Sequence, residues 1–398
     1  MNGRSWSLGV VPLLLMQISM PASAAPIDLS QLCSGGSGDC VISANTSIGS
    51  ASGALNVGGN FTVNQGVVLE FRVPVQINVS GNMVLSGTIG APGDGGAGGN
   101  GGAPGQPGGA GGNAPAVASG TINVLGSITL NASSAAATEG GSGGSGGAGG
   151  SGQLGGAGGA GGAAGSLTFN TCTAFTSATG AQVRLNGGAG GIGQTGASGG
   201  AGGAAGAFAI NAKQNILSDA AVTALGGAGG SGGSGSGANG ANGSITLNAG
   251  GTITVGSGTL NAGSNSASIN QNQTSLAALS YCVAPTVASV SPNSGRISGG
   301  SVITITGTGF LGATGVTVGG APCTNFTVVN STTITCTAPT RSSAGPVSVE
   351  VTTPSGTSTA NTLYVYQMET AIPTLSEWAV LLLTSMIVAF AAWRQRRR

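Results

Sequence analysis

The chain has 398 residues, of which 81 are glycine and only 5% are charged, and its formal net charge is +1. It contains no histidine, so the commonest general base and the commonest metal ligand are both missing, and we expect no catalytic, metal or cofactor site. The few lysines and arginines form no basic stripe, so we expect no nucleic-acid partner.

The first 24 residues have the pattern of a secretory signal peptide. Arg4 supplies a positive start, Leu8 to Met20 an apolar stretch, and Ala22-Ser23-Ala24 a small-residue cleavage site. We therefore predict that residues 1–24 are removed and that the mature chain is exported.

Six cysteines in an exported chain indicate disulfide bonds rather than thiol chemistry. The first two flank a flexible Gly/Ser loop, the last two lie within one C-terminal module, and the middle two remain by elimination. We expect the pairs Cys33–Cys40, Cys323–Cys336 and Cys172–Cys282, with the last pairing the least constrained by the sequence because six cysteines allow other connectivities.

Residues 25–89 form a β-rich region with short alternating pieces such as 59–64 and 75–80. From Gly90 the chain is dominated by four glycine runs, at 90–111, 140–161, 187–202 and 226–243, in which glycine recurs at every third position. The fourth run slips out of this frame after Gly235. A period of three matches polyproline II geometry, whereas the runs are too short and too poor in proline for collagen. Ordered extended packing and a flexible Gly/Ser linker both remain open.

Each glycine run is followed by the same short alternation of apolar and polar residues. This pattern is typical of a half-buried strand, and it recurs at 120–131, 165–170, 206–211 and 243–248. Short repeated strands that cannot bury an apolar face alone favour stacking, with the insertions emerging on one side. We predict an all-β, Gly-rich repetitive β-solenoid over residues 90–283, of the parallel β-helix type; a stacked antiparallel β architecture is the alternative.

Glycine thins out after Pro285, and about seven alternating segments over residues 284–367 predict a small β-sandwich. The series 291–295, 298–300, 305–310, 318–320 and 334–339, with Cys323, strongly resembles the IPT/TIG family of immunoglobulin-like domains. The resemblance implies that Phe310 is a core residue behind a Gly-x-Gly turn and that a Cys323–Cys336 bond ties neighbouring strands.

The C-terminal segment 372–398 combines Ile372-Pro373-Thr374-Leu375, an apolar stretch from Ala379 to Trp393 and a terminal cluster of arginines. The stretch from Leu375 to Trp393 is just long enough to cross a bilayer as one transmembrane helix, and the basic cluster should remain on the cytoplasmic side. The segment resembles bacterial sorting signals of the PEP-CTERM type, in the variant beginning Ile-Pro-Thr-Leu. This resemblance implies handling by a membrane protease of the exosortase or archaeosortase class.

These features favour a non-catalytic, adhesin-like protein of the cell surface or extracellular matrix, whose partners are exopolysaccharide or like chains. The alternative is a carbohydrate-binding or polysaccharide-degrading β-helix protein. An enzyme would need clustered charges, for which Arg184, Lys213 and Asp219 are the middle-region candidates. A sugar-binding surface would need aromatic platforms, and the available rings are as well suited to the core: Phe169, Phe175, Phe208 and Tyr281.

Overall fold

The computed structural model describes residues 26–28, 32–33, 38–51, 54–91, 109–114, 116–149, 153–273, 282–310, 312–368 and 375–396. The predicted signal peptide, Tyr281 and Ile372 to Thr374 lie outside these residues. The chain forms two compact units, divided between Ala278 and Leu279, and each is described by itself.

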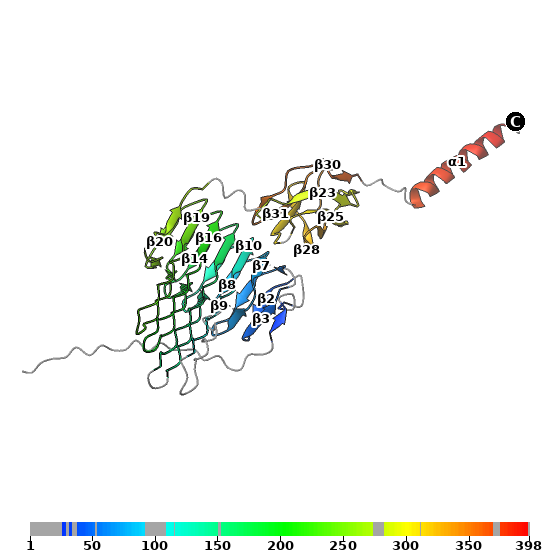
Figure 1. The fold of residues 1–398 in the computed structure, drawn as a ribbon. Helices are drawn as coiled ribbons and strands as arrows, with labels where there is room; N and C mark the ends of the chain where they lie inside the picture. The colour runs from blue at the N-terminus through cyan, green and yellow to red at the C-terminus, as the bar shows by residue number, and fades with distance from the viewer. Residues whose placement is uncertain are drawn as a thin grey trace, which may run out of the picture. The chain divides into compact units, whose positions relative to one another are not determined.

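The first unit is a three-sided solenoid of parallel strands (Figure 1). Its first side, sheet A, contains β1 (Ile27–Asp28), β3 (Thr46–Ser50), β6 (Val68–Phe71), β9 (Thr88–Ala91), β12 (Ala135–Thr138), β15 (Gln182–Arg184), β18 (Ala221–Thr223) and β21 (Leu260–Asn261). Sheet B contains β2 (Cys40–Ile42), β5 (Phe61–Val63), β8 (Met83–Leu85), β11 (Ile128–Leu130), β14 (Phe175–Ser177), β17 (Ile216–Ser218) and β20 (Ile253–Val255). Sheet C contains β4 (Leu55–Val57), β7 (Val75–Val79), β10 (Gly120–Val124), β13 (Leu167–Thr171), β16 (Phe208–Ala212), β19 (Ile245–Ala249) and β22 (Ser268–Asn270).

The chain visits the sheets in the fixed order C, B, A, so the predicted parallel β-helix is confirmed. The segment 120–131, which the sequence presents as one alternating unit, divides into β10 and β11 on two different sides. The glycine runs between β12 and β19 leave from sheet A and return to sheet C, so these arms emerge from one corner (Figure 1).

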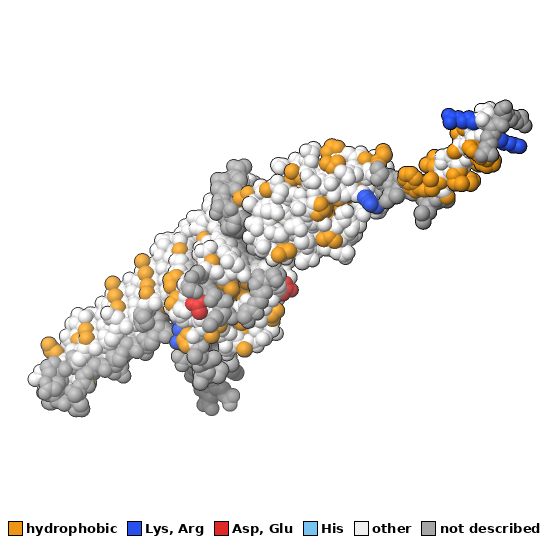
Figure 2. Space-filling view, turned by 90° about the vertical axis from the view of Figure 1, so that its right-hand side faces the viewer, with side chains coloured by type: hydrophobic (Ala, Val, Ile, Leu, Met, Phe, Trp, Pro, Cys, Tyr) orange, Lys and Arg blue, Asp and Glu red, His pale blue; other side chains and the backbone are white. Residues whose placement is uncertain are grey.

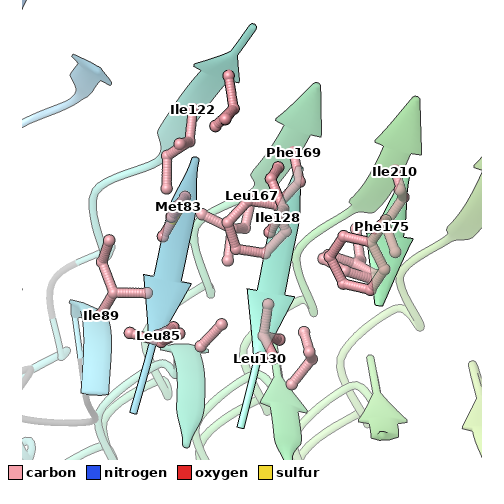
Figure 3. Close-up of a cluster of buried hydrophobic side chains, with 14 of the residues drawn as sticks. Met83, Leu85, Ile89, Ile122, Ile128, Leu130, Leu167, Phe169, Phe175 and Ile210 are labelled. Atoms are coloured by element: carbon pink, nitrogen blue, oxygen red, sulfur yellow. The ribbon is translucent and has the colours of Figure 1, made fainter. Parts of the chain in front are cut away.

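Side chains alternate along each strand between the inside and the outside of the solenoid, and the inward-facing ones are apolar in all three sheets. The strands pair in register, so identical positions stack along the solenoid: in sheet C, Ile122 aligns with Ile77 and Phe169. Phe169 packs against Phe175 and Phe208, with ring centroids 6.0 Å apart in both pairs, and all three rings are buried. Figure 3 shows Phe169 and Phe175 among the buried apolar side chains. Full burial of such side chains stabilises a fold by about 1.5–3 kcal/mol each. These phenylalanines are therefore core residues and not a sugar-binding platform.

The second unit is a β-sandwich-like module, as the sequence predicts. One sheet has the order β23 (Thr286–Ser291), β25 (Val302–Thr308), β29 (Thr333–Thr337), β28 (Thr324–Asn330). A second sheet has the order β24 (Ser294–Arg296), β33 (Tyr364–Gln367), β30 (Gly345–Val347). A third has the order β27 (Ala321–Pro322), β26 (Gly315–Val318), β31 (Val349–Thr353), β32 (Gly356–Thr357). Helix α1 (Leu375–Gln395) follows the module in the chain.

Candidate functional site

The glycine arms form a two-layered structure, which we call the glycine bundle. Its described parts are a returning leg at 109–118, interrupted at 115, and three arms at 139–165, 186–206 and 225–243, the first of these interrupted at 150–152. In each arm the chain runs away from sheet A along an outgoing leg and back to sheet C along a returning leg. The outgoing legs form one layer, in which Gly140 and Gly143 donate backbone hydrogen bonds to the carbonyls of Asn186 and Ala189, at 2.9 and 2.8 Å. Because donors and acceptors both advance by three residues, the legs are extended with three residues per turn, as in polyproline II.

Returning legs form the other layer in the same way. Gly158 and Gly161 donate to the carbonyls of Ser198 and Ala201, at 3.0 and 2.8 Å. The second glycine of each triplet joins the layers: Gly159 donates to the Gly144 carbonyl and Gly188 to the Gly162 carbonyl, at 2.8 and 2.9 Å. Two of every three N–H groups are therefore used inside the bundle, and ordered packing replaces the flexible linker that the sequence left open.

At most of these positions in the arms only glycine fits. A Cβ atom on Gly191 would overlap the Gly144 carbonyl oxygen, and one on Gly190 would overlap the Gly200 carbonyl oxygen. Backbone atoms cannot yield as a flexible side chain can, so any side chain here would force neighbouring legs apart.

The third residue of each triplet points outward and gives the bundle its surface. Ala189, Ala201 and Ala238 are exposed, and in the described arms the single charged residue is Glu139 at the base. Figure 2 shows small apolar groups over an otherwise uncharged surface on this part of the molecule. The described arms thus offer a surface of small side chains and, beyond Glu139 at the base, no charged group for chemistry.

The three candidate catalytic residues lie in different parts of the solenoid. Arg184 is in β15 of sheet A, where its Nε lies 3.5 Å from Glu139 Oε2. Lys213 follows β16 of sheet C, and Asp219 follows β17 of sheet B, where its Oδ1 accepts a 2.8 Å hydrogen bond from the Ser257 N–H. The fold does not gather these three residues on one side of the solenoid. Within the described residues, no group of three His, Cys, Asp or Glu side chains is placed to hold a metal.

A ladder of asparagines on sheet C is the polar feature that the sequence reasoning did not identify. Asn170 donates to Asn123 at 2.8 Å and accepts from Asn211 at 2.7 Å. The same contact continues along one row: Asn56, Asn78, Asn123, Asn170, Asn211, Asn248 and Asn270. The signal was visible, because the repeated strand unit carries asparagine at the same place each time.

The C-terminal module is closed around an aromatic core. Phe310 is fully buried behind Gly309, whose φ of 72° lies in the left-handed region that favours glycine. Tyr366 packs edge-to-face on Tyr364, with centroids 5.1 Å apart, and its hydroxyl donates to the Pro339 carbonyl at 2.6 Å. Burial, with a smaller contribution from Tyr364, raises the pKa of the Tyr366 phenol.

Helix α1 carries the apolar face of the predicted tail. Its segment Trp378–Gln395 has a mean hydropathy of 1.4 over 18 residues and is long and apolar enough to cross a membrane. The described side chains are exposed in this segment, and Arg394 lies in its last turn. This arrangement fits a membrane anchor.

Comparison with known families bears on the C-terminal third of the chain. Residues 285–366 match the family model of the IPT/TIG domain, and residues 370–398 match that of the IPTL-CTERM motif. The chain contains an IPT/TIG domain and an IPTL-CTERM motif. Together they fit a surface or extracellular protein, and the motif with its apolar helix is consistent with membrane anchoring and processing.

Three further similarities are partial. The chain is 52% identical to Fibrocystin-L of Mus musculus over 56 residues, which are 14% of this chain and 1% of that protein. The Plexin A4 extracellular region aligns with 21% of this chain and 9% of its own, at 26% identity and a TM-score of 0.20. Gamma-CGTase from Alkalophilic bacillus clarkii aligns with 22% of this chain and 12% of its own, at 27% identity and a TM-score of 0.18. The chain thus spans a small fraction of each relative.

The cysteines complete the description of both units. Cys33 is bonded to Cys40, the first residue of β2, and in the IPT/TIG domain Cys323 is bonded to Cys336 of β29. Cys172 and Cys282 are buried and each is disulfide-bonded. Their pairing with each other stays a prediction.

Proposed function

We propose that this is a non-catalytic protein of the cell surface or extracellular matrix, which is sorted through its IPTL-CTERM motif and presents the solenoid and glycine bundle for adhesion. The observation that carries the proposal is the combination in one chain of a sorting tail with a rigid, repetitive and nearly uncharged surface. An exosortase-like membrane protease is the expected processing partner of the tail.

The construction of the bundle supports a role in contact rather than in chemistry. Its hydrogen-bonded layers hold outward-facing alanines and serines in fixed positions, so contact with a neutral partner costs little additional ordering of the protein. An uncharged face also carries no long-range repulsion against another uncharged surface, such as a neutral exopolysaccharide or a like chain.

Sorting is tested by replacing Ile372, Pro373, Thr374 and Leu375 with alanine in the full chain. We expect the native protein to be accessible to protease added outside intact cells, with a processed C-terminus by mass spectrometry. The alanine variant should keep its unprocessed tail. Met368→Ala, at an exposed position before the motif, is the matched control. Processing that is unaffected by the four substitutions would contradict the proposed role of the motif.

Adhesion and catalysis are separated in one further experiment on the full chain in detergent. We expect the protein to co-sediment with neutral bacterial exopolysaccharide or with itself, and to leave the polymer length unchanged. Depolymerisation that disappears in Lys213→Ala or Asp219→Asn would replace the adhesive proposal with the enzymatic one. Absence of both co-sedimentation and self-association would overturn adhesion without affecting the result on sorting.

A further inference from the structure

The glycine bundle has a direction, because each outgoing leg donates its hydrogen bonds to the arm that follows. Gly187 and Gly190 of the arm 186–206 donate to the carbonyls of Leu225 and Ala228 in the arm 225–243, at 2.9 and 2.8 Å. No further glycine run follows the arm 225–243 in the sequence. The corresponding donors of this last arm, Gly226 and Gly229, therefore need another acceptor.

Two asparagine side chains from the returning leg of the same arm supply it. The Gly226 N–H donates to Asn242 Oδ1 and the Gly229 N–H donates to Asn239 Oδ1, each at 2.9 Å. The two asparagine side-chain oxygens thus replace the backbone carbonyls that a following arm would supply.

At Asn239 a side chain fits only because the arm is the last one, whereas Asn242 corresponds to Ala205, which carries a side chain in the preceding arm. Asn239 corresponds to Gly202 of the preceding arm, since their following residues, Gly240 and Gly203, both donate across the layers. A Cβ atom on Gly202 would overlap the Gly227 carbonyl oxygen of the next arm. Because of the frame slip after Gly235, asparagine (Asn239) stands at the position equivalent to Gly202, and alanine (Ala238) stands at the outward position before it.

The loop after β21 covers the base of the same edge. Asn265 Nδ2 donates to the carbonyls of Gly243 and Asn242, at 2.8 and 3.1 Å, and Asn242 Nδ2 donates to Ser264 Oγ at 3.0 Å. Donors and acceptors at the base of the edge are therefore both engaged by the chain itself.

The opposite edge of the described bundle has complementary chemistry. Ala110, Asn113 and Ala116 occupy the positions whose carbonyls accept hydrogen bonds in later arms, and no described backbone N–H donates to them. These carbonyls lie on a returning leg, so in a second copy they would match the N–H groups of Asn239 and Asn242. The equivalent residues of the preceding arm, Gly202 and Ala205, donate to the carbonyls of Ala238 and Ala241. Such a head-to-tail contact is heterologous, and it builds open filaments unless the rotation between copies closes a ring.

We propose that Asn239 and Asn242 terminate the glycine bundle by capping its last donor edge, and that they prevent a second copy of the chain from adding to it as a further arm. Natural sheets protect their edges by comparable means, because a row of unpaired backbone groups is a template for another chain. Self-association of this protein then proceeds through faces of the bundle and not through this edge.

Four double variants of the full chain in mild detergent test the proposal by sedimentation velocity and by hydrogen exchange of the peptide 225–231. Asn239→Gly with Asn242→Gly removes both caps and the obstructing side chain of Asn239, so oligomers should form that grow with concentration beyond the native state. Asn239→Ala with Asn242→Ala removes only the acceptors, so the two glycine amides should exchange about tenfold faster without new oligomers.

The remaining variants are controls. Asn239→Asp with Asn242→Asp keeps an acceptor oxygen at both places, so Gly226 and Gly229 should exchange as in the native chain, although the bond from residue 242 to Ser264 is lost. Ala238→Gly with Ala241→Gly adds the same number of glycines at outward positions and should leave the edge capped. A native sedimentation profile for the double glycine variant, despite fast exchange at Gly226 and Gly229, would overturn the role against assembly; unchanged exchange in the double alanine variant would overturn the capping.

Discussion

The solenoid core and the glycine bundle belong to the same compact unit, yet opposite principles hold them together. In the core, the strands bring large apolar side chains such as Phe169 into contact, and the stabilisation comes from their removal from water. In the bundle, the legs approach until backbone N–H and carbonyl groups bond directly, which requires that there be no side chain at two of every three positions.

This difference predicts which changes each region tolerates. A core position accepts another apolar residue of similar volume, because the interior is filled by volume rather than by identity. An inward-facing glycine such as Gly191 accepts no side chain, because the neighbouring atom is backbone. The same single methyl group is therefore a minor change in one region and a major one in the other.

The largest effect is expected at the centre of the core. Phe169→Ala leaves a cavity against Phe175 and Phe208 and should lower the stability of the solenoid by about 3–5 kcal/mol. Phe169→Leu keeps most of the volume and should cost clearly less. Native-state hydrogen exchange of β10 and β13 measures this, since it reports on the solenoid apart from the IPT/TIG domain. Equal losses for both substitutions would show that volume is not what matters at this position.

A smaller but still large effect is expected from one added methyl group in the bundle. Gly191→Ala places a Cβ atom on the Gly144 carbonyl and should break the neighbouring bonds from Gly191 to Gly159 and from Gly200 to Gly191, at a cost of about 2–3 kcal/mol. Exchange should accelerate in both arms while β10 and β13 stay protected. Ile192→Ala, at the next and exposed position, should change neither. Protected arms in Gly191→Ala would contradict the close approach of the legs.

The strands, the IPT/TIG domain and the C-terminal helix could be predicted from the sequence, because alternation and motif spacing are local signals. Phe310, for example, is buried where the family resemblance puts it. Whether the glycine arms are ordered or flexible could not be predicted. A period of three in glycine is the same in a random linker and in packed polyproline II legs, and the distinction depends on contacts such as that from Gly144 to Gly112, 32 residues earlier in the chain.

The functional features of the surface were visible only in part. The frame slip after Gly235 is plain in the sequence, but its meaning requires knowing that the neighbouring Gly229 has lost its acceptor. Asn170 likewise repeats with the strand unit, yet only the parallel register places it directly against Asn123 and Asn211. Local periodicity identifies such residues, and long-range register gives them their role.

The smallest effect is expected in the asparagine ladder, where polar side chains hold neighbouring strands together. Asn170→Asp keeps an acceptor for Asn211 but loses the donor to Asn123, so two oxygens face each other at a buried position. We expect a loss of about 1–3 kcal/mol at neutral pH by the same exchange measurement. Asn56→Asp, at the exposed end of the ladder, should be nearly neutral, because Asn56 accepts a bond from Asn78 and its replacement accepts equally well.

The pH dependence of Asn170→Asp distinguishes the lost donor from a change of shape. Burial opposite an oxygen should raise the pKa of the new carboxyl in the folded state above its unfolded value of about 3.9. The protonated carboxyl can donate to Asn123, so the stabilising bond is fully present below the unfolded pKa and is lost as the pH rises through the folded pKa. The stability difference from the native chain should therefore shrink below about pH 4. A difference that stays constant between acidic and neutral pH would mean that packing, and not the direction of the hydrogen bonds along the ladder, stabilises this side of the solenoid.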